Sequence, residues 1–230
     1  MSTTTHIIIA IDGPAGSGKS TTAKLVAKKL GFVYVDTGAM YRAVTLSWIR
    51  QGKPDIDIFL KQLPKIELRL HPETREQCTI LDGIDVSQEI RSSEVTQQVS
   101  YISSLKEVRD TMVSLQRNIG SNHDVVMDGR DIGTAVFPNA NLKIFMIADI
   151  QERAKRRLME LTSSLNGDKP SLEDIIDSMK QRDAYDSGRE IDPLKMAEDA
   201  ILLDTSQMSI EEQADFIIKK AEFLRNTFQE

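Results

Sequence analysis

The segment Gly13–Ser20, which reads GPAGSGKS, constrains the fold of this chain more than any other feature. It satisfies the pattern G-x-x-x-x-G-K-[ST], in which glycines let backbone N–H groups turn inward around phosphate oxygens. The apolar run His6–Ile11 precedes the segment, and apolar residues at helical spacing over Lys19–Leu30 follow it. A phosphate-binding loop between a buried strand and a helix predicts a parallel sheet and a bound nucleoside triphosphate.

The loop and the residue after it have separate predicted roles in holding the triphosphate. Lys19 is expected to reach the β- and γ-phosphates, and the Ser20 hydroxyl is expected to ligate Mg²⁺. The dipole of the helix that begins near Lys19 favours the same anion. The alternative is a chance match in a glycine-containing turn. The predicted strand before the motif and the predicted helix after it favour the phosphate-binding role. The predicted triphosphate-binding residues are Gly13, Pro14, Ala15, Gly16, Ser17, Gly18, Lys19, Ser20 and Thr21.

Four further apolar segments predict strands of the same sheet. They are Phe32–Val35, Val125–Met127, Leu142–Ile147 and Ala200–Leu203. Helical patterns separate them and follow them, at Gly38–Gln51, within Gln151–Arg189 and at Ser209–Phe228. Strands that alternate with helices imply right-handed crossovers, so we predict a doubly wound, parallel, five-stranded α/β sheet.

Residues 54–94 interrupt this alternation. Ile66–Leu70 alternates apolar and polar residues with period 2, and Thr79–Leu81 follows after a short polar segment. Asp82–Ile84 continues the second run through a glycine turn. The pattern predicts a small antiparallel, β-containing insert outside the main sheet.

Composition excludes several classes of protein. The formal net charge of -6 and an aromatic content of 5% argue against a nucleic-acid-binding protein. Cys78 is the only cysteine, the N-terminus has no signal-peptide pattern, and no apolar run has the length of a membrane span. We therefore expect a cytoplasmic protein. The three histidines have no ligand-like spacing, so no metal cage of histidines is predicted.

Asp36–Arg42, the segment DTGAMYR, follows the second predicted strand. Ligands of open parallel sheets lie beyond the carboxyl ends of the strands, so this segment is in a suitable place for binding. Thr37 can cap the following helix, and Arg42 can form a bidentate pair with a phosphate. The alternative is an ordinary capped helix with a solvated arginine.

Asp128–Asp131, the segment DGRD, follows the third predicted strand. A salt-bridged turn and the wall of an anion-binding pocket are both compatible with it, since buried charges need partners. Asp128 follows an apolar run, as an aspartate near Mg²⁺ does in other phosphate-loop proteins, or it orients Arg130.

Two further groups of charged residues lie between the fourth and fifth strands. Arg153, Arg156 and Arg157 form either a solvated helix face or a group that closes over transferring phosphates. Arg182, Asp186 and Arg189 have the spacing i, i+4 and i+7, which predicts one helix face. On such a face, Arg182 and Asp186 can also form a simple helix-stabilising pair.

The motifs together resemble the bacterial cytidylate kinase family over about Ile9 to Ser206. The segments that carry the resemblance are IDGPAGSGKST, DTGAMYR, DGRDIGTAVFP, ERAKRR, RDAYDSGR and PLKMAEDAILLDTS. The resemblance implies a monomeric P-loop kinase that phosphorylates CMP and dCMP with ATP and Mg²⁺. It implies a core of residues 1–36, 104–150 and 190–230. It also implies a CMP-binding region over 37–103, with the insert at about 54–94, and a lid with its following helix over 151–189.

The resemblance also implies roles for individual residues. Arg42, Arg130 and Arg182 would hold the acceptor phosphate, together with Arg189. Ser100, Arg109 and Asp131 would read cytosine, and Asp186 would bind the sugar hydroxyls. The expected catalytic residues are Lys19, Arg130, Arg182, Arg153 and Arg157. The expected substrate-binding residues are Thr37, Arg42, Ser100, Arg109, Asp128, Arg130, Asp131, Arg182, Asp186 and Arg189.

Two other functions fit a phosphate-binding loop. One is a kinase for a different nucleoside monophosphate or for a small-molecule acceptor. The other is a nucleotide-dependent switch protein that hydrolyses its nucleotide slowly, which predicts turnover without an acceptor. The base-reading pattern Asn-Lys-x-Asp of GTPases does not occur in the sequence.

Overall fold

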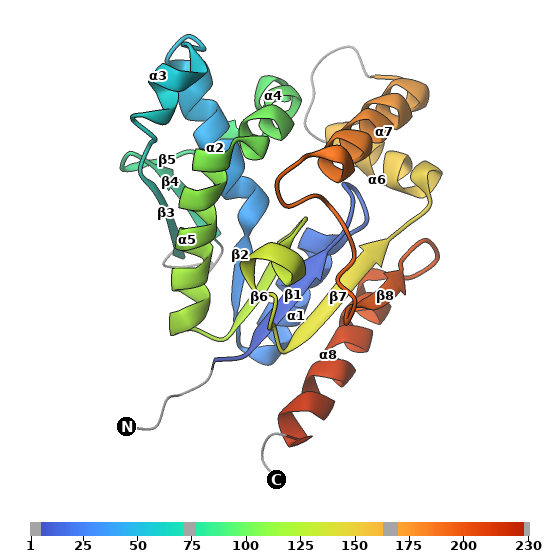
Figure 1. Cartoon of the computed structure of the whole chain (residues 1–230). Coiled ribbons are helices and arrows are strands. Elements are labelled where there is room, and N and C mark those ends of the chain that lie inside the picture. The colour runs from blue at the N-terminus through green and yellow to red at the C-terminus, as the bar shows by residue number, and fades with distance from the viewer. Residues whose placement is uncertain (1–5, 71–76, 163–169, 228–230) are drawn as a thin grey trace, which may run out of the picture. The chain divides into compact units, whose positions relative to one another are not determined.

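A computed structural model describes residues 6–70, 77–162 and 170–227, so parts of the predicted insert and lid, residues 71–76 and 163–169, lie outside the described residues. The chain forms two compact units (Figure 1). The first unit comprises residues 1–34 and 123–230, and the second comprises residues 35–122.

A five-stranded sheet with the order β2-β6-β1-β7-β8 is the centre of the fold. Its strands are β1 (Ile8–Asp12), β2 (Val33–Asp36), β6 (Val125–Gly129), β7 (Leu142–Ile147) and β8 (Ile201–Asp204). β1 runs parallel to β6 and β7, and β7 runs parallel to β8. The predicted doubly wound, parallel, five-stranded sheet is therefore confirmed.

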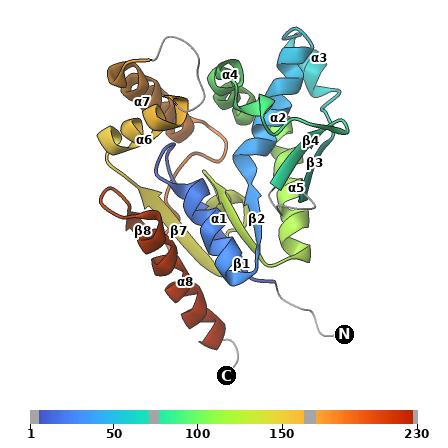
Figure 2. The same cartoon turned by 180° about the vertical axis from the view of Figure 1, so that it is seen from behind.

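Two helices of the first unit, α1 (Lys19–Leu30) and α8 (Ile210–Thr227), cover one face of this sheet (Figure 2). Ile9 and Ile144 of the strands belong to the same buried cluster as Val26 of α1 and Ile217 of α8. Consecutive residues of the central strands, such as Ala10 and Ile11 or Val126 and Met127, are fully buried, as expected from the continuous apolar runs.

Two helices follow β7 in the same unit, α6 (Ile150–Thr162) and α7 (Leu172–Gly188). Ala154 of α6 packs with Ile175 and Met179 of α7, and Ala15 of the phosphate loop packs against this cluster. A reciprocal capping box between Ser171 and Asp174 begins α7. A short π-helical turn, η2 (Ile132–Val136), lies between β6 and β7.

The second unit contains the predicted insert. It consists of α2 (Thr37–Arg50), α3 (Ile56–Leu60), β3 (Ile66–Leu70), β4 (Gln77–Leu81), β5 (Ile84–Asp85), η1 (Glu89–Arg91), α4 (Ser93–Ser104) and α5 (Lys106–Asn122). β3, β4 and β5 form a separate antiparallel sheet, as predicted. Met40 and Val44 of α2 share its core with Leu81, Ile102 and Met112.

One detail of the second unit corrects the sequence interpretation. Asp36, and not Thr37, caps α2: its carboxylate accepts a hydrogen bond from the Ala39 N–H at 2.9 Å. Thr37 is the first residue of the helix itself. Both residue types cap helices well, so their order alone did not distinguish them. Among the described residues, no helix has the length and apolar character of a membrane span.

Candidate active site

The phosphate loop has the conformation that its glycines predict. Gly13, Gly16 and Gly18 have φ angles of 144°, 75° and 92°, which residues other than glycine rarely adopt. A Cβ atom on Gly13 would lie 2.0 Å from the carbonyl oxygen of Met146, so no larger residue fits. Gly18 is the N-cap of α1, and the loop therefore leads directly into a helix N-terminus that favours anions.

Lys19 is buried at the start of α1, and its ammonium group lies within the loop. Nζ donates to the Pro14 carbonyl oxygen at 2.6 Å and to Ser17 Oγ at 3.4 Å. Burial, and then the nearby Arg130 guanidinium, lower the pKa of Lys19 well below its usual range. A phosphate next to this group would stabilise the charged ammonium.

Asp128, at the end of β6, connects the phosphate loop to β2. Its carboxylate accepts hydrogen bonds from Ser20 Oγ at 2.8 Å and from the Tyr34 hydroxyl at 2.7 Å. Carboxylate and hydroxyl oxygens are ligands that Mg²⁺ accepts, and this ion usually keeps several water and phosphate ligands besides. The pair of Asp128 and Ser20 therefore fits a magnesium ion bound mainly through the phosphates of a nucleotide.

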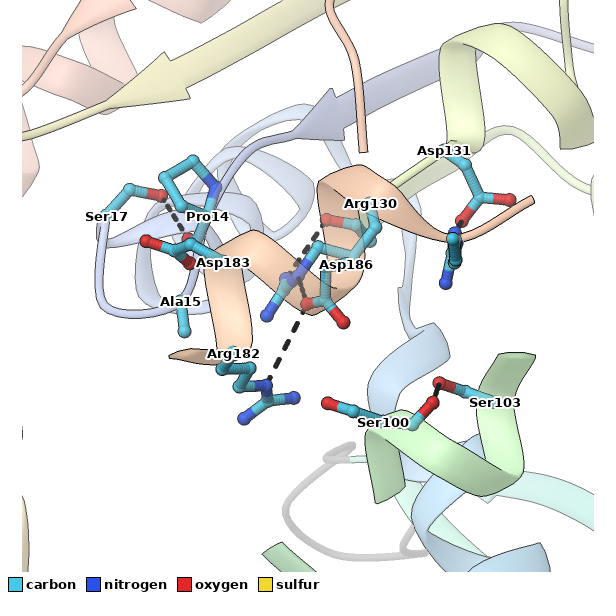
Figure 3. Close-up of polar contacts among 12 residues, drawn as sticks. Pro14, Ala15, Ser17, Ser100, Ser103, Arg130, Asp131, Arg182, Asp183 and Asp186 are labelled. Atoms are coloured by element: carbon cyan, nitrogen blue, oxygen red, sulfur yellow. Dashed lines mark hydrogen bonds and ion pairs between the residues drawn. The ribbon is translucent and has the colours of Figure 1, made fainter. Parts of the chain in front are cut away.

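Arg130 and Arg182 share one carboxylate. Arg130 Nε lies 3.0 Å from Asp186 Oδ2, and Arg182 Nε lies 3.9 Å from the same oxygen (Figure 3). Burial, and then repulsion from Arg130, lower the pKa of Arg182 to about 10. Arg182 Nε is buried, and no hydrogen-bond partner for it is found within the described residues. Two guanidinium groups on one carboxylate leave net positive charge, which an anion would balance.

Asp131 pairs with Arg189. Arg189 donates from one terminal nitrogen to Asp131 Oδ1 at 3.1 Å, and both side chains are buried. The prediction that Arg182, Asp186 and Arg189 share one helix face is wrong for Arg189. α7 ends at Gly188, and Arg189 has an extended backbone with φ and ψ of -64° and 145°. The turn after the helix brings Arg189 to the end of β6, next to Asp131.

The arginines of α6 have three different environments. Arg153 is buried, and it donates to Asp183 at 2.6 Å, to the Ala15 carbonyl at 3.1 Å and to the Ala148 carbonyl at 3.1 Å. The alternative of a solvated basic face is therefore wrong for Arg153. Arg156 donates to the Thr205 carbonyl oxygen at 2.7 Å, and Arg157 pairs with Glu160 of its own helix at 2.9 Å.

The second unit holds the other predicted site residues, Thr37, Arg42, Ser100 and Arg109. Thr37 is buried. Arg42 donates to Thr96 Oγ1 at 2.9 Å and to the Ile90 carbonyl at 3.3 Å. The carbonyl oxygen of Ser100 accepts from Ser103 Oγ (Figure 3).

Arg109 is unusual because it is a charged residue that is only 1% exposed. Its guanidinium lies 5.7 Å from the centre of the Tyr41 ring, and it donates to the Ser103 carbonyl at 3.4 Å.

Three residues of the first unit were not predicted from the sequence: Asp12, Tyr34 and Asp183. Asp12 offers a signal in retrospect, because an acidic residue ends an apolar strand directly before the phosphate loop. Tyr34 and Asp183 carry no such signal, since only the fold brings them to Asp128 and Arg153. Over residues 6–70, 77–162 and 170–227, no group of three or more His, Cys, Asp or Glu residues could hold a metal.

The parallel sheet and the phosphate loop at the carboxyl end of β1 place the chain in the class of P-loop proteins. A solved structure with this fold is a gluconokinase from Sinorhizobium meliloti 1021. It matches with a TM-score of 0.50 at 11% identity and covers 97% of both chains. At that identity, the likeness concerns the fold alone.

Sequence comparison identifies the family within this class. The family model described as cytidylate kinase matches residues 9–223. A protein named cytidylate kinase from Chlorobaculum tepidum is 52% identical over 92% of this chain and 91% of its own length. Another protein of that name, from Fusobacterium nucleatum, is 46% identical over 94% and 98% of the two chains. The chain therefore belongs to the cytidylate kinase family.

Proposed function

We propose that this chain transfers the γ-phosphoryl group of ATP to the 5′-phosphate of CMP and dCMP. The observation that carries the proposal is the group of cations next to the phosphate loop, in a chain of this family. Lys19, Arg130 and Arg182 influence one another electrostatically, and burial lowers the pKa of Lys19 and Arg182. Bound phosphates would relieve this repulsion. The transfer requires two of them side by side, the γ-phosphate of ATP and the 5′-phosphate of the acceptor.

The reaction needs little covalent chemistry from the protein. An oxygen of the acceptor phosphate forms a bond to the γ-phosphorus while the bond to the bridging oxygen of ATP breaks, and ADP leaves. The attacking oxygen is already anionic, so no strong general base is required. Catalysis comes from alignment and from cations around the transferring group, which we assign to Lys19, Arg130, Arg182, Arg153 and Arg157.

Ser20 and Asp128 are the residues that we assign to Mg²⁺. Ser20 Oγ donates its hydrogen to Asp128, so the lone pairs of the Ser20 oxygen remain available for a cation. Bound Mg²⁺ would neutralise charge on the nucleotide phosphates. Arg153 also donates to Asp183 and to the Ala15 carbonyl, so besides adding positive charge near the phosphates it would hold the loop against α6 and α7.

The family resemblance suggests which residues recognise the acceptor. We assign its phosphate to Arg42, Arg130, Arg182 and Arg189 and also to Thr37, and its sugar to Asp186. We assign cytosine to Ser100, Arg109 and Asp131. Cytosine offers an amine donor, a ring-nitrogen acceptor and a carbonyl acceptor, which suit a carboxylate and an arginine. Uracil reverses the donor and acceptor pattern and would leave buried groups unpaired.

A panel of acceptors tests the proposal. The chain is incubated with ATP and Mg²⁺ and with CMP, dCMP, UMP, AMP or no acceptor, and the release of ADP is measured. We expect rapid turnover with CMP and dCMP and little with the others. Preference for another acceptor would support a different kinase, and equal turnover without an acceptor would support a switch protein.

The base-reading role has its own test. Asp131→Ala should reduce the ratio of kcat/KM for CMP to that for UMP by at least 10-fold, since a buried polar mismatch is worth orders of magnitude. An unchanged ratio would contradict the assignment. We also propose that the chain is monomeric and cytoplasmic, and size-exclusion chromatography with light scattering tests the first point.

A further inference from the structure

Asp12 is the last residue of β1 and directly precedes Gly13, the first residue of the phosphate loop. Its side chain is 5% exposed. Oδ1 accepts the backbone N–H of Ile132 at 2.8 Å, and Oδ2 accepts the N–H of Gly133 at 2.7 Å. These two N–H groups come immediately after Arg130 and Asp131. One carboxylate thus joins the start of the phosphate loop to the backbone that carries two predicted acceptor residues.

The backbone of Asp12 has little freedom to move. It lies in the middle strand of the sheet, opposite Gly129 of β6 and Phe145 of β7. The next residue, Gly13, is so close to the Met146 carbonyl that no Cβ atom fits there. A side chain on such a backbone holds its hydrogen-bond partners at a defined distance from the loop.

The turn that contains Ile132 and Gly133, whose N–H groups bind the Asp12 carboxylate, is also confined. A Cβ atom on Gly133 would lie 3.1 Å from Cδ of Lys143 and 3.4 Å from Oδ2 of Asp12. Lys143 is fixed in turn by an ion pair to Asp199 at 2.8 Å. The turn therefore rests directly on the Asp12 carboxylate and on the stem of Lys143, and it cannot shift without losing both contacts.

This arrangement is not the most stable one for such a position. Burial raises the pKa of Asp12 to about 7, even though both backbone hydrogen bonds and Lys19 favour the charged form, and Asp131 raises it further. A buried carboxylate of this kind costs folding stability when it ionises. An interaction that is costly for stability but geometrically specific is typical of residues that preorganise a site.

We propose that Asp12 is a positioning residue of the phosphotransfer site, which holds Arg130 and Asp131 in register with the phosphate loop and Lys19. The role rests on the proposed CMP kinase activity. Asp12 would act through the backbone that carries these residues, since its two oxygens accept the N–H groups of Ile132 and Gly133. Loss of the register should affect the alignment of the acceptor and the reading of the base, but leave the ATP contacts intact.

Asp12→Asn tests this role with little change in shape. The amide NH₂ group would face one of the two N–H donors, so one hydrogen bond is replaced by a donor–donor contact. At pH 8 we expect kcat with CMP to fall about 10- to 100-fold, because small misplacements are costly for in-line transfer. The ratio of kcat/KM for CMP to that for UMP should fall about 5-fold or more. KM for ATP should change less than about 2-fold, because uniform binding is retained.

Two further variants separate positioning from general destabilisation. Gly133→Ala pushes the same turn away from Asp12 and should lower kcat and the CMP-to-UMP ratio in the same direction. Ile217→Val is the matched control, because Ile217 is a fully buried core residue of the same unit on α8. It should lower the urea midpoint of unfolding slightly and leave both kinetic quantities unchanged.

Amide hydrogen exchange provides a readout that does not depend on the acceptor. At least one of the N–H groups of residues 132 and 133 should exchange at least 10-fold faster in Asp12→Asn than in the wild type, whereas amides in β7 should not. Unchanged exchange, or an unchanged CMP-to-UMP ratio in both site variants, overturns the positioning role. If the wild type does not phosphorylate CMP, the proposed function fails, and the exchange measurement still decides whether Asp12 holds the turn.

Discussion

Asp12→Asn is expected to change how the free energy of unfolding depends on pH. Burial raises the pKa of Asp12 from 3.8 to about 7 in the folded chain. Between these two values, the unfolded chain has lost the proton and the folded chain has kept it. The folded state then binds more protons, so stability falls as the pH rises through this window. Below the window both states are protonated, and above it both are ionised.

The size of the effect follows from the shift. A difference of about 3 pKa units corresponds to about 4 kcal/mol, present in full above pH 7 and absent below about pH 3. Between pH 5 and pH 8, the Asp12 contribution to the free energy of unfolding should therefore fall by about 2 to 3 kcal/mol. Asparagine does not titrate, so the variant lacks this contribution at every pH.

The assay is urea unfolding of the wild type and of Asp12→Asn at pH 5 and pH 8. The other titratable groups are shared by both proteins, so they cancel in the difference between the two. The lost hydrogen bond and the donor–donor contact also cancel, because they do not depend on pH. We expect the stability of the variant relative to the wild type to be higher at pH 8 than at pH 5, by about 2 to 3 kcal/mol. A change below about 0.5 kcal/mol would refute a raised pKa at Asp12.

Three further substitutions test other parts of the structure. Arg130→Ala should lower kcat with CMP about 100-fold or more, as removal of a cation from a transferring phosphate does, and near-normal kinetics would contradict the phosphate assignment. Arg153→Ala removes the cation from Asp183, whose side chain is only 21% exposed, and should cost about 1 to 2 kcal/mol in urea unfolding, with Arg157→Ala, at a more exposed pair, as the control that changes stability little. Gln116 is fully buried, and neither of its side-chain amide atoms has a hydrogen-bond partner in the described part of the chain. Gln116→Leu should raise stability by about 1 kcal/mol without changing turnover, and a loss of stability would show that a partner was missed.

The central sheet could be predicted from the sequence because its strands are buried on both faces. Runs such as Leu142–Ile147 are continuous and apolar, and the predicted and observed bounds of that strand agree. The phosphate loop could be predicted for a different reason, since all of its contacts are local and its glycines are demanded by backbone conformation. Both features depend on residues that are close together in the chain.

The details of the site depend on residues far apart in the chain, and these could not be predicted. Asp12 and Ile132 are 120 positions apart, and the N–H group that Asp12 binds exists at every residue type except proline. Arg153 belongs to a basic segment that looks solvated, and its partner Asp183 is 30 positions away. α7 ends at Gly188, so Arg189 lies outside the helix, where it reaches Asp131. The i, i+4, i+7 spacing of the charged residues instead suggested a helix that continues through Arg189.

The pairing of charges in the first unit has a consequence for how the site would work. Arg130 donates a hydrogen bond to Asp186, and Arg189 donates one to Asp131, so these two guanidinium groups are oriented before any substrate binds. Arg130 and Arg182 both lie near the single carboxylate of Asp186, so their combined positive charge exceeds the negative charge of that carboxylate. Cations that are oriented in advance and only partly neutralised suit a phosphate ligand, because preorganised charge is the basis of electrostatic catalysis. Burial, and then repulsion from Arg130, lower the pKa of Lys19 and of Arg182, so the positively charged forms of both groups are disfavoured in the absence of an anion. Nucleotide binding should therefore stabilise this unit beyond what its direct contacts supply.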